Sequence, residues 1–233
     1  FILLSFLIPH GSTYLFIHMT VVSPSILSAD FANLRRDIEM LNESEAEMIH
    51  LDVMDGIFVP NISFGFPVIK AVARYARKTL DAHLMIEDPG RYVSQFRDCG
   101  VDIMNVHIET CNHLNRVVQN IRQAGMKAAV TLNPSSPVVL LEDIAADLDM
   151  VLLMSVNPGF AAQQFIPGTL DKITRLRRLL DETGSKALIQ IDGGINATTG
   201  KACVERGADI LVAGNYVFSD PDPAARISEL RHL

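Results

Sequence analysis

Residues 47–53 read EMIHLDV, a short apolar run with strand character that carries two side chains able to bind a metal. Successive side chains of a strand point to opposite sides, so His50 and Asp52 lie on the same side of this strand. Similar apolar runs recur along the chain at intervals of roughly 25 to 30 residues. The recurrence indicates one repeated unit of strand and helix.

Eight such runs alternate with longer amphipathic segments. In chain order they read VVSPSILS from Val21, EMIHLDV from Glu47, LDAHLMI from Leu80, DIMNVHIE from Asp102, KAAVTLN from Lys127, MVLLMSV from Met150, ALIQIDG from Ala187 and ILVAGNYV from Ile210. The spacing between them predicts helices that include 31–41, 67–77, 114–124, 170–182 and 198–206. Four helical segments are each followed by a glycine that is expected to end the helix, namely Gly100, Gly125, Gly184 and Gly207.

Strict alternation of strands and helices implies a parallel sheet with right-handed crossovers. Eight units close into a single (β/α)8 TIM barrel, which is the fold we expect for 19–233. The competing fold is an open, doubly wound sheet. That fold usually has fewer strands and, when it binds nucleotides, a glycine fingerprint after the first strand. The corresponding segment here, PSILSAD at 24–30, has no such fingerprint.

Composition narrows the class of partner. The 233 residues are 48% apolar, which suits one large α/β domain, and the formal net charge is −7. The chain has no cluster of Lys and Arg, which argues against nucleic acid and favours a small molecule. Its three cysteines, Cys99, Cys111 and Cys203, form no CxxC pair, which suits a reducing cytoplasm better than a disulfide framework.

The first eighteen residues, FILLSFLIPHGSTYLFIH, are apolar in patches. Pro9, His10, Gly11 and Ser12 interrupt the apolar stretch, and no basic segment precedes it. Both a signal peptide and a membrane anchor are therefore poorly supported, and no membrane partner is expected. We interpret 1–18 as a non-native or disordered extension outside the fold, with Met19 as the natural start.

Residues with metal-binding chemistry fall near the ends of several runs. His50 and Asp52 are joined by His83 in DAHLMI and by Asp192 in IQIDGG. In a TIM barrel the carboxyl ends of the strands meet on one face, where active sites lie. A lone histidine is more often a core residue. Two imidazoles and two carboxylates on one face instead predict a site for a divalent metal beside groups able to remove a proton next to a carbonyl.

Glycine-bearing loops form a second pattern. VNPGFAAQ at 156–163 follows the sixth run, DGGIN at 192–196 the seventh and AGN at 213–215 the eighth. On one rim of a barrel their backbone N–H groups would converge, and such groups can bind a phosphate dianion. Any one of these glycines could serve a tight turn alone. Three loops on the same side favour a phosphate site, which recurs at this position of the fold.

A series of motifs, in order and spacing, resembles the ribulose-phosphate 3-epimerase family. They are PSILSADF at 24–31, HLDVMDG at 50–56, FVPNISFG at 58–65, HLMIEDP at 83–89, VNPGF at 156–160, IDGGI at 191–195 and VAGNYVF at 212–218. The resemblance runs from about Val21 to the C-terminus. It implies an enzyme of the pentose phosphate pathway that interconverts D-ribulose 5-phosphate and D-xylulose 5-phosphate with one divalent metal. It also implies a homo-oligomer, either a dimer or a hexamer.

The resemblance assigns roles residue by residue. The metal ligands would be His50, Asp52, His83 and Asp192, with Asp52 and Asp192 as the two acid–base groups on opposite faces of a planar enediolate. The donor set suits Zn²⁺, Fe²⁺, Mn²⁺ or Co²⁺ and does not choose among them. Substrate contacts would come from Ser25, His83, Met54, Met85, Met154, Gly159, Phe160, Ala161, Ala162, Gly193, Gly194, Gly214 and Asn215. His107 and Glu109 would be either supporting groups or structural polar residues.

Two departures from the family pattern concern the phosphate end. Ala161 and Ala162 stand where relatives usually have GG or AG, and Asn215 stands where serine is common. Three other functions stay open at this point. They are epimerisation of a 6-carbon ketose phosphate such as D-allulose 6-phosphate, cleavage by a metal-dependent aldolase, and a non-catalytic phosphosugar-binding barrel with a structural metal. A structural metal site would usually be closed and rich in cysteine, which makes the last of these the weakest.

Overall fold

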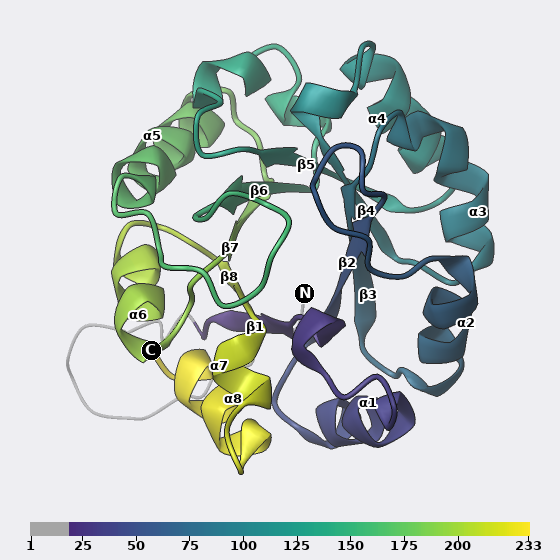
Figure 1. Ribbon diagram of the computed structural model, residues 1–233. Helices are drawn as coiled ribbons and strands as arrows, with labels where there is room; N and C mark the ends of the chain where they lie inside the picture. Colours follow the sequence, from purple (N-terminus) through teal and green to yellow (C-terminus); the bar gives the residue numbers. More distant parts are fainter. Residues whose placement is uncertain (1–18) are drawn as a thin grey trace, which may run out of the picture.

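Residues 19–233 are described by a computed structural model, and they form one barrel of eight parallel strands ringed by helices (Figure 1). The predicted extension at 1–18 lies outside the described residues. The strands are β1 (Val21–Pro24), β2 (Met48–Met54), β3 (Thr79–Met85), β4 (Ile103–His107), β5 (Lys127–Leu132), β6 (Met150–Met154), β7 (Leu188–Asp192) and β8 (Ile210–Ala213). Each overlaps one of the eight apolar runs, so the predicted (β/α)8 fold is confirmed.

An α-helix follows every strand except β5, which is joined to β6 by two short 3₁₀ helices. The α-helices are α1 (Leu34–Glu43), α2 (Phe66–Tyr75), α3 (Val93–Asp98), α4 (Leu114–Gln123), α5 (Thr169–Glu182), α6 (Ala197–Glu205), α7 (Asn215–Phe218) and α8 (Pro223–Arg231). Short 3₁₀ helices are η1 (Ile26–Ser28), η2 (Pro89–Tyr92), η3 (Ile108–Thr110), η4 (Val138–Leu141) and η5 (Ala145–Asp147). The four glycines expected to end helices, Gly100, Gly125, Gly184 and Gly207, all have positive φ, between 68° and 102°.

Two predicted boundaries were wrong for local reasons. The first helix begins at Leu34 rather than Phe31, because Asp30 binds the backbone N–H of Ala32 and holds the chain in a turn. The run ILVAGNYV is only half strand. Strand β8 ends at Ala213, and Gly214 turns the chain into α7, which begins at Asn215.

The sheet has the order β1-β8-β7-β6-β5-β4-β3-β2, with every named pairing parallel. Strand β1 pairs with β8 from Val21 opposite Ile210 to Pro24 opposite Ala213. Contacts between β1 and β2 complete the ring. Ser25 forms a parallel bridge with His50, and the backbone N–H of Glu47 donates to the carbonyl of Val22 at 3.2 Å.

The barrel interior is apolar at one end and polar above it. Five side chains fill the end at which the strands begin, namely Met48, Ile103, Ala129, Met150 and Ile210. The layer above holds completely buried polar residues, namely Ser23, His50, Asp81, Asn105, Thr131 and Gln190. The main apolar core lies between the strands and the helices, where alternate strand residues such as Ile49 and Leu51 face outward.

The polar layer is joined by hydrogen bonds that cross the barrel. Thr131 Oγ1 donates to Asn105 Oδ1 at 2.7 Å, and Asn105 Nδ2 lies 3.5 Å from Gln190 Oε1. Gln190 Nε2 in turn donates to Asp81 Oδ2 at 2.7 Å. Buried polar groups are costly unless they are paired. This network therefore fixes side chains of four different strands beneath the mouth of the barrel.

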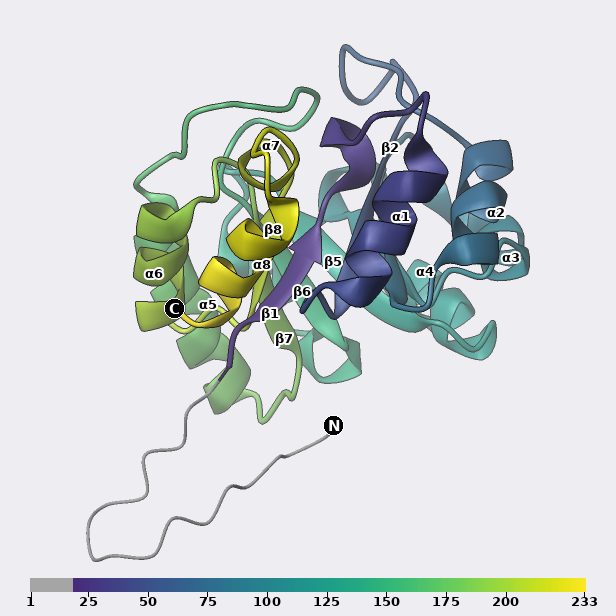
Figure 2. The same cartoon turned by 90° about the horizontal axis from the view of Figure 1, so that it is seen from below.

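The loops at the carboxyl ends of the strands rise over that mouth. The segment between β6 and α5 crosses above the barrel, and the segment between β2 and α2 rises beside it (Figures 1 and 2). Asn61 Nδ2, in the second segment, donates to the carbonyl of Gly159 in the first at 2.9 Å. No helix among residues 19–233 has the length and apolar content that crossing a membrane requires.

Candidate active site

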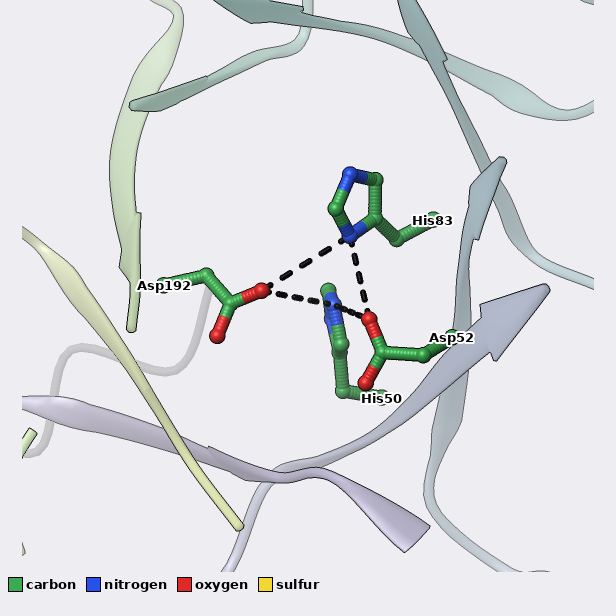
Figure 3. Close-up of side chains that lie close together, drawn as sticks. All are labelled: His50, Asp52, His83 and Asp192. Carbon is green, nitrogen blue, oxygen red and sulfur yellow. Dashed lines mark hydrogen bonds and ion pairs between the residues drawn. The ribbon is translucent and has the colours of Figure 1, made fainter. Parts of the chain in front are cut away.

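Four side chains meet at the mouth of the barrel, and they are the four that the sequence predicted as metal ligands. His50 and Asp52 come from β2, His83 from β3 and Asp192 from the last position of β7. In the register of β2 and β3, Asp52 stands opposite His83, so both side chains point into the barrel at the same level. One ligand atom from each residue lies within 4.8 Å of the other three (Figure 3).

The two imidazoles approach the same two carboxylate oxygens. His50 Nε2 lies 3.4 Å from Asp52 Oδ1 and 3.8 Å from Asp192 Oδ2. His83 Nδ1 lies 3.1 Å and 3.7 Å from the same two atoms. Both histidines are completely buried, whereas the Asp192 side chain keeps 17% of its surface exposed. The cluster is thus closed from below and open on the side of Asp192.

His50 is held by a carboxylate on the side away from the cluster. Its Nδ1 lies 2.8 Å from Asp81 Oδ2, the oxygen that also accepts from Gln190. A carboxylate can only accept, so Nδ1 carries a proton and Nε2 is the nitrogen that faces Asp52 and Asp192. Nε2 is buried and has no hydrogen-bond partner. A buried, unpartnered nitrogen beside two carboxylates fits a divalent cation, and the carboxylate behind it is the usual support of a metal-binding histidine.

His83 is held by a second histidine. Its Nε2 lies 2.9 Å from Nε2 of His107, whose ring stacks on that of His83 with centroids 5.0 Å apart. His107 Nδ1 lies 3.1 Å from Oε2 of Glu109. The other carboxylate oxygen of Glu109 accepts from the backbone N–H of Asn133 at 2.9 Å and from the Ser136 hydroxyl. The two histidines of the cluster therefore have different supports and present different nitrogens.

The surroundings of the two carboxylates shift their pKa values in opposite directions. For Asp52, burial opposes the charged form, but His50 and His83 outweigh it and hold the pKa of Asp52 well below its usual range. Ser25 Oγ also donates to Asp52 Oδ2. For Asp192, burial and the nearby negative charge of Asp52 raise the pKa to about 7. One carboxylate is set to be ionised and the other to hold a proton near neutral pH.

The pKa values of the two histidines are also shifted in opposite directions. Burial lowers the pKa of His50, but Asp52 and Asp81 outweigh it and raise that pKa well above the ordinary value. Burial lowers the pKa of His83, and it lowers the pKa of His107 to about 4. The attraction of the Asp52 carboxylate for positive charge at His50 would act equally on a cation bound beside them.

A cavity of about 540 Å³ opens above the four-residue cluster. Asp52 and Asp192 form its floor, and His50 and His83 lie beneath them. The other predicted contact residues all line it, namely Ser25, Met54, Met85, Met154, Gly159, Phe160, Ala161, Ala162, Gly193, Gly194, Gly214 and Asn215. The structure thus brings the whole predicted set to one place.

The methionines form the apolar part of the cavity wall. Met54, Met85 and Met154 end three strands and are each at most 4% exposed. Met54 and Met85 pack with Val59, and Met154 belongs to a separate apolar cluster on β6. The wall beside the carboxylates is therefore adaptable and excludes water.

The glycine loops form the opposite part of the wall, and two of the glycines are required by close contacts. A Cβ on Gly193 would lie 2.5 Å from a methyl of Val156, and one on Gly194 would lie 2.6 Å from the backbone nitrogen of Phe165. Both have positive φ, 119° and 64°. Ala162, one of the two departures from the family pattern, also has positive φ, 57°, which an alanine adopts at a cost.

Several residues of the site escaped the sequence analysis. Asp81 and Gln190, which hold His50, are polar residues inside apolar strands, and that placement was the available signal. Asn196 and Thr199 line the cavity at the start of α6, where they form a capping box. Their spacing, N-x-x-T, could have indicated a helix start beside DGG.

Comparison with known proteins agrees with these features. The sequence model of the Ribulose-phosphate 3 epimerase family matches residues 21–218. The chain is 49% identical over 214 residues to ribulose-phosphate 3-epimerase of Bacillus subtilis. The matched region covers 91% of this chain and 99% of that protein. The chain is 46% identical to the enzyme of the same name from Synechocystis, covering 91% and 93%, and 40% identical to that of Escherichia coli K12, covering 91% and 94%.

Solved structures extend the likeness of the fold. The tryptophan synthase α-subunit of Pyrococcus furiosus superposes with a TM-score of 0.67 at 16% identity, covering 93% of this chain and 98% of that one. At this level of identity the likeness concerns the barrel alone.

Proposed function

This chain belongs to the ribulose-phosphate 3-epimerase family, and on that premise we propose that it interconverts D-ribulose 5-phosphate and D-xylulose 5-phosphate. The observation that carries the proposal is the set of four ligand atoms within 4.8 Å of one another on the floor of a cavity of about 540 Å³. Two of the four residues are carboxylates whose pKa values are shifted in opposite directions. Epimerisation next to a ketone requires one group that accepts a proton and one that donates a proton. The reaction inverts one carbon through a planar enediolate.

Asp52 is the base in one direction of the reaction. Its low pKa keeps it ionised, and the hydroxyl of Ser25 holds one of its oxygens in place. A low pKa also makes a carboxylate a weak base. Exclusion of water by the bound sugar and by Met54 and Met85 would strengthen its pull on the substrate proton.

Asp192 is the acid in the same direction. It enters from β7, while Asp52 enters from β2, so the two carboxylates reach the substrate from different walls of the barrel. Without a bound metal the pKa of Asp192 is raised to about 7, so the protein around it favours the protonated form from which a proton can be delivered to the opposite face of the enediolate. The roles exchange in the reverse reaction.

His50, Asp52, His83 and Asp192 would hold one divalent metal ion. When bound, the cation supplies a Lewis acid that stabilises the negative charge developing on the substrate oxygens. We expect Zn²⁺, Fe²⁺, Mn²⁺ or Co²⁺, since two imidazoles and two carboxylates suit each of them. The geometry of the unpartnered His50 Nε2 supports this assignment.

The phosphate would bind at the glycine-bearing wall of the cavity. Gly193, Gly194, Gly214 and Asn215 line this wall, where the chain turns from β7 and β8 into helices. Backbone N–H groups at such turns and helix starts are free to bind an anion. Asn215 supplies an amide donor where a serine hydroxyl is common. Gly159, Phe160, Ala161 and Ala162 would cover the bound sugar.

The test is solvent-deuterium incorporation into D-ribulose 5-phosphate, followed by NMR with chelator-treated and with metal-reconstituted protein. Label at the third carbon together with xylulose 5-phosphate, and only with metal, is the expected result. Exchange with D-allulose 6-phosphate alone would transfer the proposal to the 6-carbon sister reaction. Absence of exchange with both sugars in the metal-loaded protein would contradict epimerisation.

Replacement of either acid–base carboxylate should abolish turnover and leave the fold in place. We expect Asp52→Asn and Asp192→Asn each to lower kcat by about 10²-fold to 10⁴-fold or more. Each substitution removes one of the two proton-transfer groups. Circular dichroism and sedimentation of the variants check the fold. An Asp192→Asn variant that turns over at the wild-type rate would contradict the two-base scheme.

We also propose a homo-oligomer, a dimer or a hexamer. Large apolar side chains are exposed on the described surface, including Ile57, Ile62, Val139 and Leu140. Such side chains are common at subunit contacts. Light scattering coupled to size-exclusion chromatography gives the mass directly, and a monomer at micromolar concentration would contradict this proposal.

A further inference from the structure

Behind the metal-ligand histidine His83 lie two polar groups, His107 and Glu109, that the reaction does not use directly. His83 Nε2 faces His107 Nε2 at 2.9 Å, and His107 Nδ1 faces Glu109 Oε2 at 3.1 Å. Both histidines are completely buried, and Glu109 lies at the rim, with 23% of its side chain exposed. The three residues thus form a chain that runs from the floor of the cavity to the protein surface.

The positions of the protons in this chain follow from its two ends. In the metal-free protein His83 Nδ1 lies 3.1 Å from Asp52 Oδ1. When a metal is bound, this nitrogen must present a lone pair and is unprotonated. The proton of the neutral ring is then on Nε2, where His107 Nε2 must accept it. The remaining proton of His107 is on Nδ1, and Glu109 accepts it. Each hydrogen bond is possible in one direction only.

Glu109 in turn has one orientation. Its Oε1 accepts from the backbone N–H of Asn133 at 2.9 Å and from the hydroxyl of Ser136, while Oε2 is left for His107. A backbone N–H is always a donor, so the group facing Asn133 must be an acceptor. A carboxylate satisfies both neighbours because both of its oxygens accept.

We infer that His107 and Glu109 are positioning residues that set the tautomer of His83 and thereby present Nδ1 to the metal. This inference rests on the metal site proposed above. His50 reaches the same result by a shorter route, through Asp81. The difference means that the metal affinity contributed by His83 depends on a carboxylate at the rim of the barrel that touches neither metal nor substrate.

The decisive variant is Glu109→Gln. A glutamine must turn its amide oxygen to the N–H of Asn133, which leaves its NH₂ group facing His107 Nδ1. That nitrogen would then have to accept, and the protons of His107 and His83 would move to Nε2 and Nδ1. The substitution keeps the size of the side chain and reverses the direction of the hydrogen bonds from residue 109 to His83. His83 would then present an N–H to the metal.

The matched control is Ser136→Ala, which removes one donor to Glu109 and leaves the carboxylate in place. Zn²⁺ affinity, measured by competition with a chromophoric chelator, should fall about 10-fold to 100-fold in Glu109→Gln and stay within about threefold of wild type in Ser136→Ala. Long-range ¹H–¹⁵N correlation spectra of the metal-free proteins should show a proton on His83 Nε2 in wild type and none on that nitrogen in Glu109→Gln.

The outcomes separate this inference from the proposed function. A Glu109→Gln protein with wild-type Zn²⁺ affinity and an unchanged His83 tautomer would overturn the inference and leave the metal site standing, whatever its thermal stability. A wild-type protein that binds no Zn²⁺ would overturn the metal site, and the inference with it. A fall in affinity equal in Glu109→Gln and Ser136→Ala would assign the effect to packing at the rim and would also overturn it.

Discussion

At the scale of single residues, the site separates groups of the same chemical type by their surroundings. Asp52 lies between two imidazoles, and Asp192 lies against Asp52 with part of its surface toward the cavity. The first is held ionised and the second is raised toward neutrality. A carboxylate pair of this kind can supply a base and an acid at one pH without any change of fold.

The raised pKa of Asp192 predicts a stability difference that depends on pH. The folded protein holds this proton more tightly than the unfolded chain, whose carboxyl titrates near 3.8. The protonated carboxyl therefore adds most to the free energy of unfolding at low pH. This stabilisation is lost as the pH rises from 3.8 to about 7. In chelator-treated protein, Asp192→Asn should gain stability relative to wild type over this window, on the order of 4 kcal/mol.

Urea unfolding of both proteins at the two ends of this window measures the difference. Zn²⁺ should reverse the order, because the wild-type carboxylate would bind the cation and the amide would bind it less well. A constant difference across the window, without metal, would show that the pKa of Asp192 is not raised in the folded protein.

Ala162 gives a second prediction at this scale. Its φ of 57° costs an alanine about 1–2 kcal/mol, and glycine relieves that cost while losing about 0.5–1 kcal/mol of chain entropy. Ala162→Gly should therefore leave the free energy of unfolding unchanged or raise it by about 1 kcal/mol. Its neighbour Ala161 has no positive φ, so Ala161→Gly should lower it by about 0.5–1 kcal/mol. Equal losses in the two variants would contradict strain at Ala162.

At the scale of elements, the strands could be predicted because both of their faces are buried. The residues facing the helices and those facing the barrel interior give continuous apolar runs in which a polar residue stands out. Helix α8 was not predicted, since only Ile227 and Leu230 are buried along it. Helix α7, four residues long, was mistaken for the end of a strand. Short helices carry too few apolar positions for a period to be seen.

The supports of the site could not be predicted for a different reason. Asp81 and Gln190 are 109 residues apart, and they meet only because the sheet closes with one particular register. A parallel register is set by the whole barrel rather than by any local motif. The ligands were found because their residue types are unusual in strands. Their partners required the structure.

The loop after β7 gives a prediction for an element. A Cβ on Gly194 would lie 2.6 Å from the backbone of Phe165, so Gly194→Ala must displace the cavity wall. We expect an increase in KM of at least about 10-fold and a loss of more than about 2 kcal/mol in unfolding free energy. The control is Gly125→Ala, with φ of 87° and open space around it, which should cost about 1 kcal/mol and leave KM unchanged. Equal KM values in the two variants would contradict a role of this wall in binding.

At the scale of the whole molecule, the site joins strands from distant parts of the barrel. A cation held by β2, β3 and β7 binds the folded protein and not the unfolded chain, so it should stabilise the entire domain. At a free metal concentration about a thousand times the Kd, the gain is about 4 kcal/mol, which for a domain of this size raises Tm by about 10 °C. Calorimetry with and without chelator measures it. An equal shift in Asp192→Asn would place the stabilising metal elsewhere.

The pairing of β1 with β8 bears on how the enzyme is made. Ser25, which holds Asp52, follows the first strand, and its backbone N–H is bound by the carbonyl of Ala213 at the end of the eighth. A ribosome delivers these two strands first and last among the eight, and domains tend to fold as units. Until β8 emerges, the nascent chain has an open sheet edge where β1 should be paired, and the cavity lacks its wall at Gly214. Activity should therefore not appear before β8 has been synthesised, and a truncated product that has lost β8 should be inert.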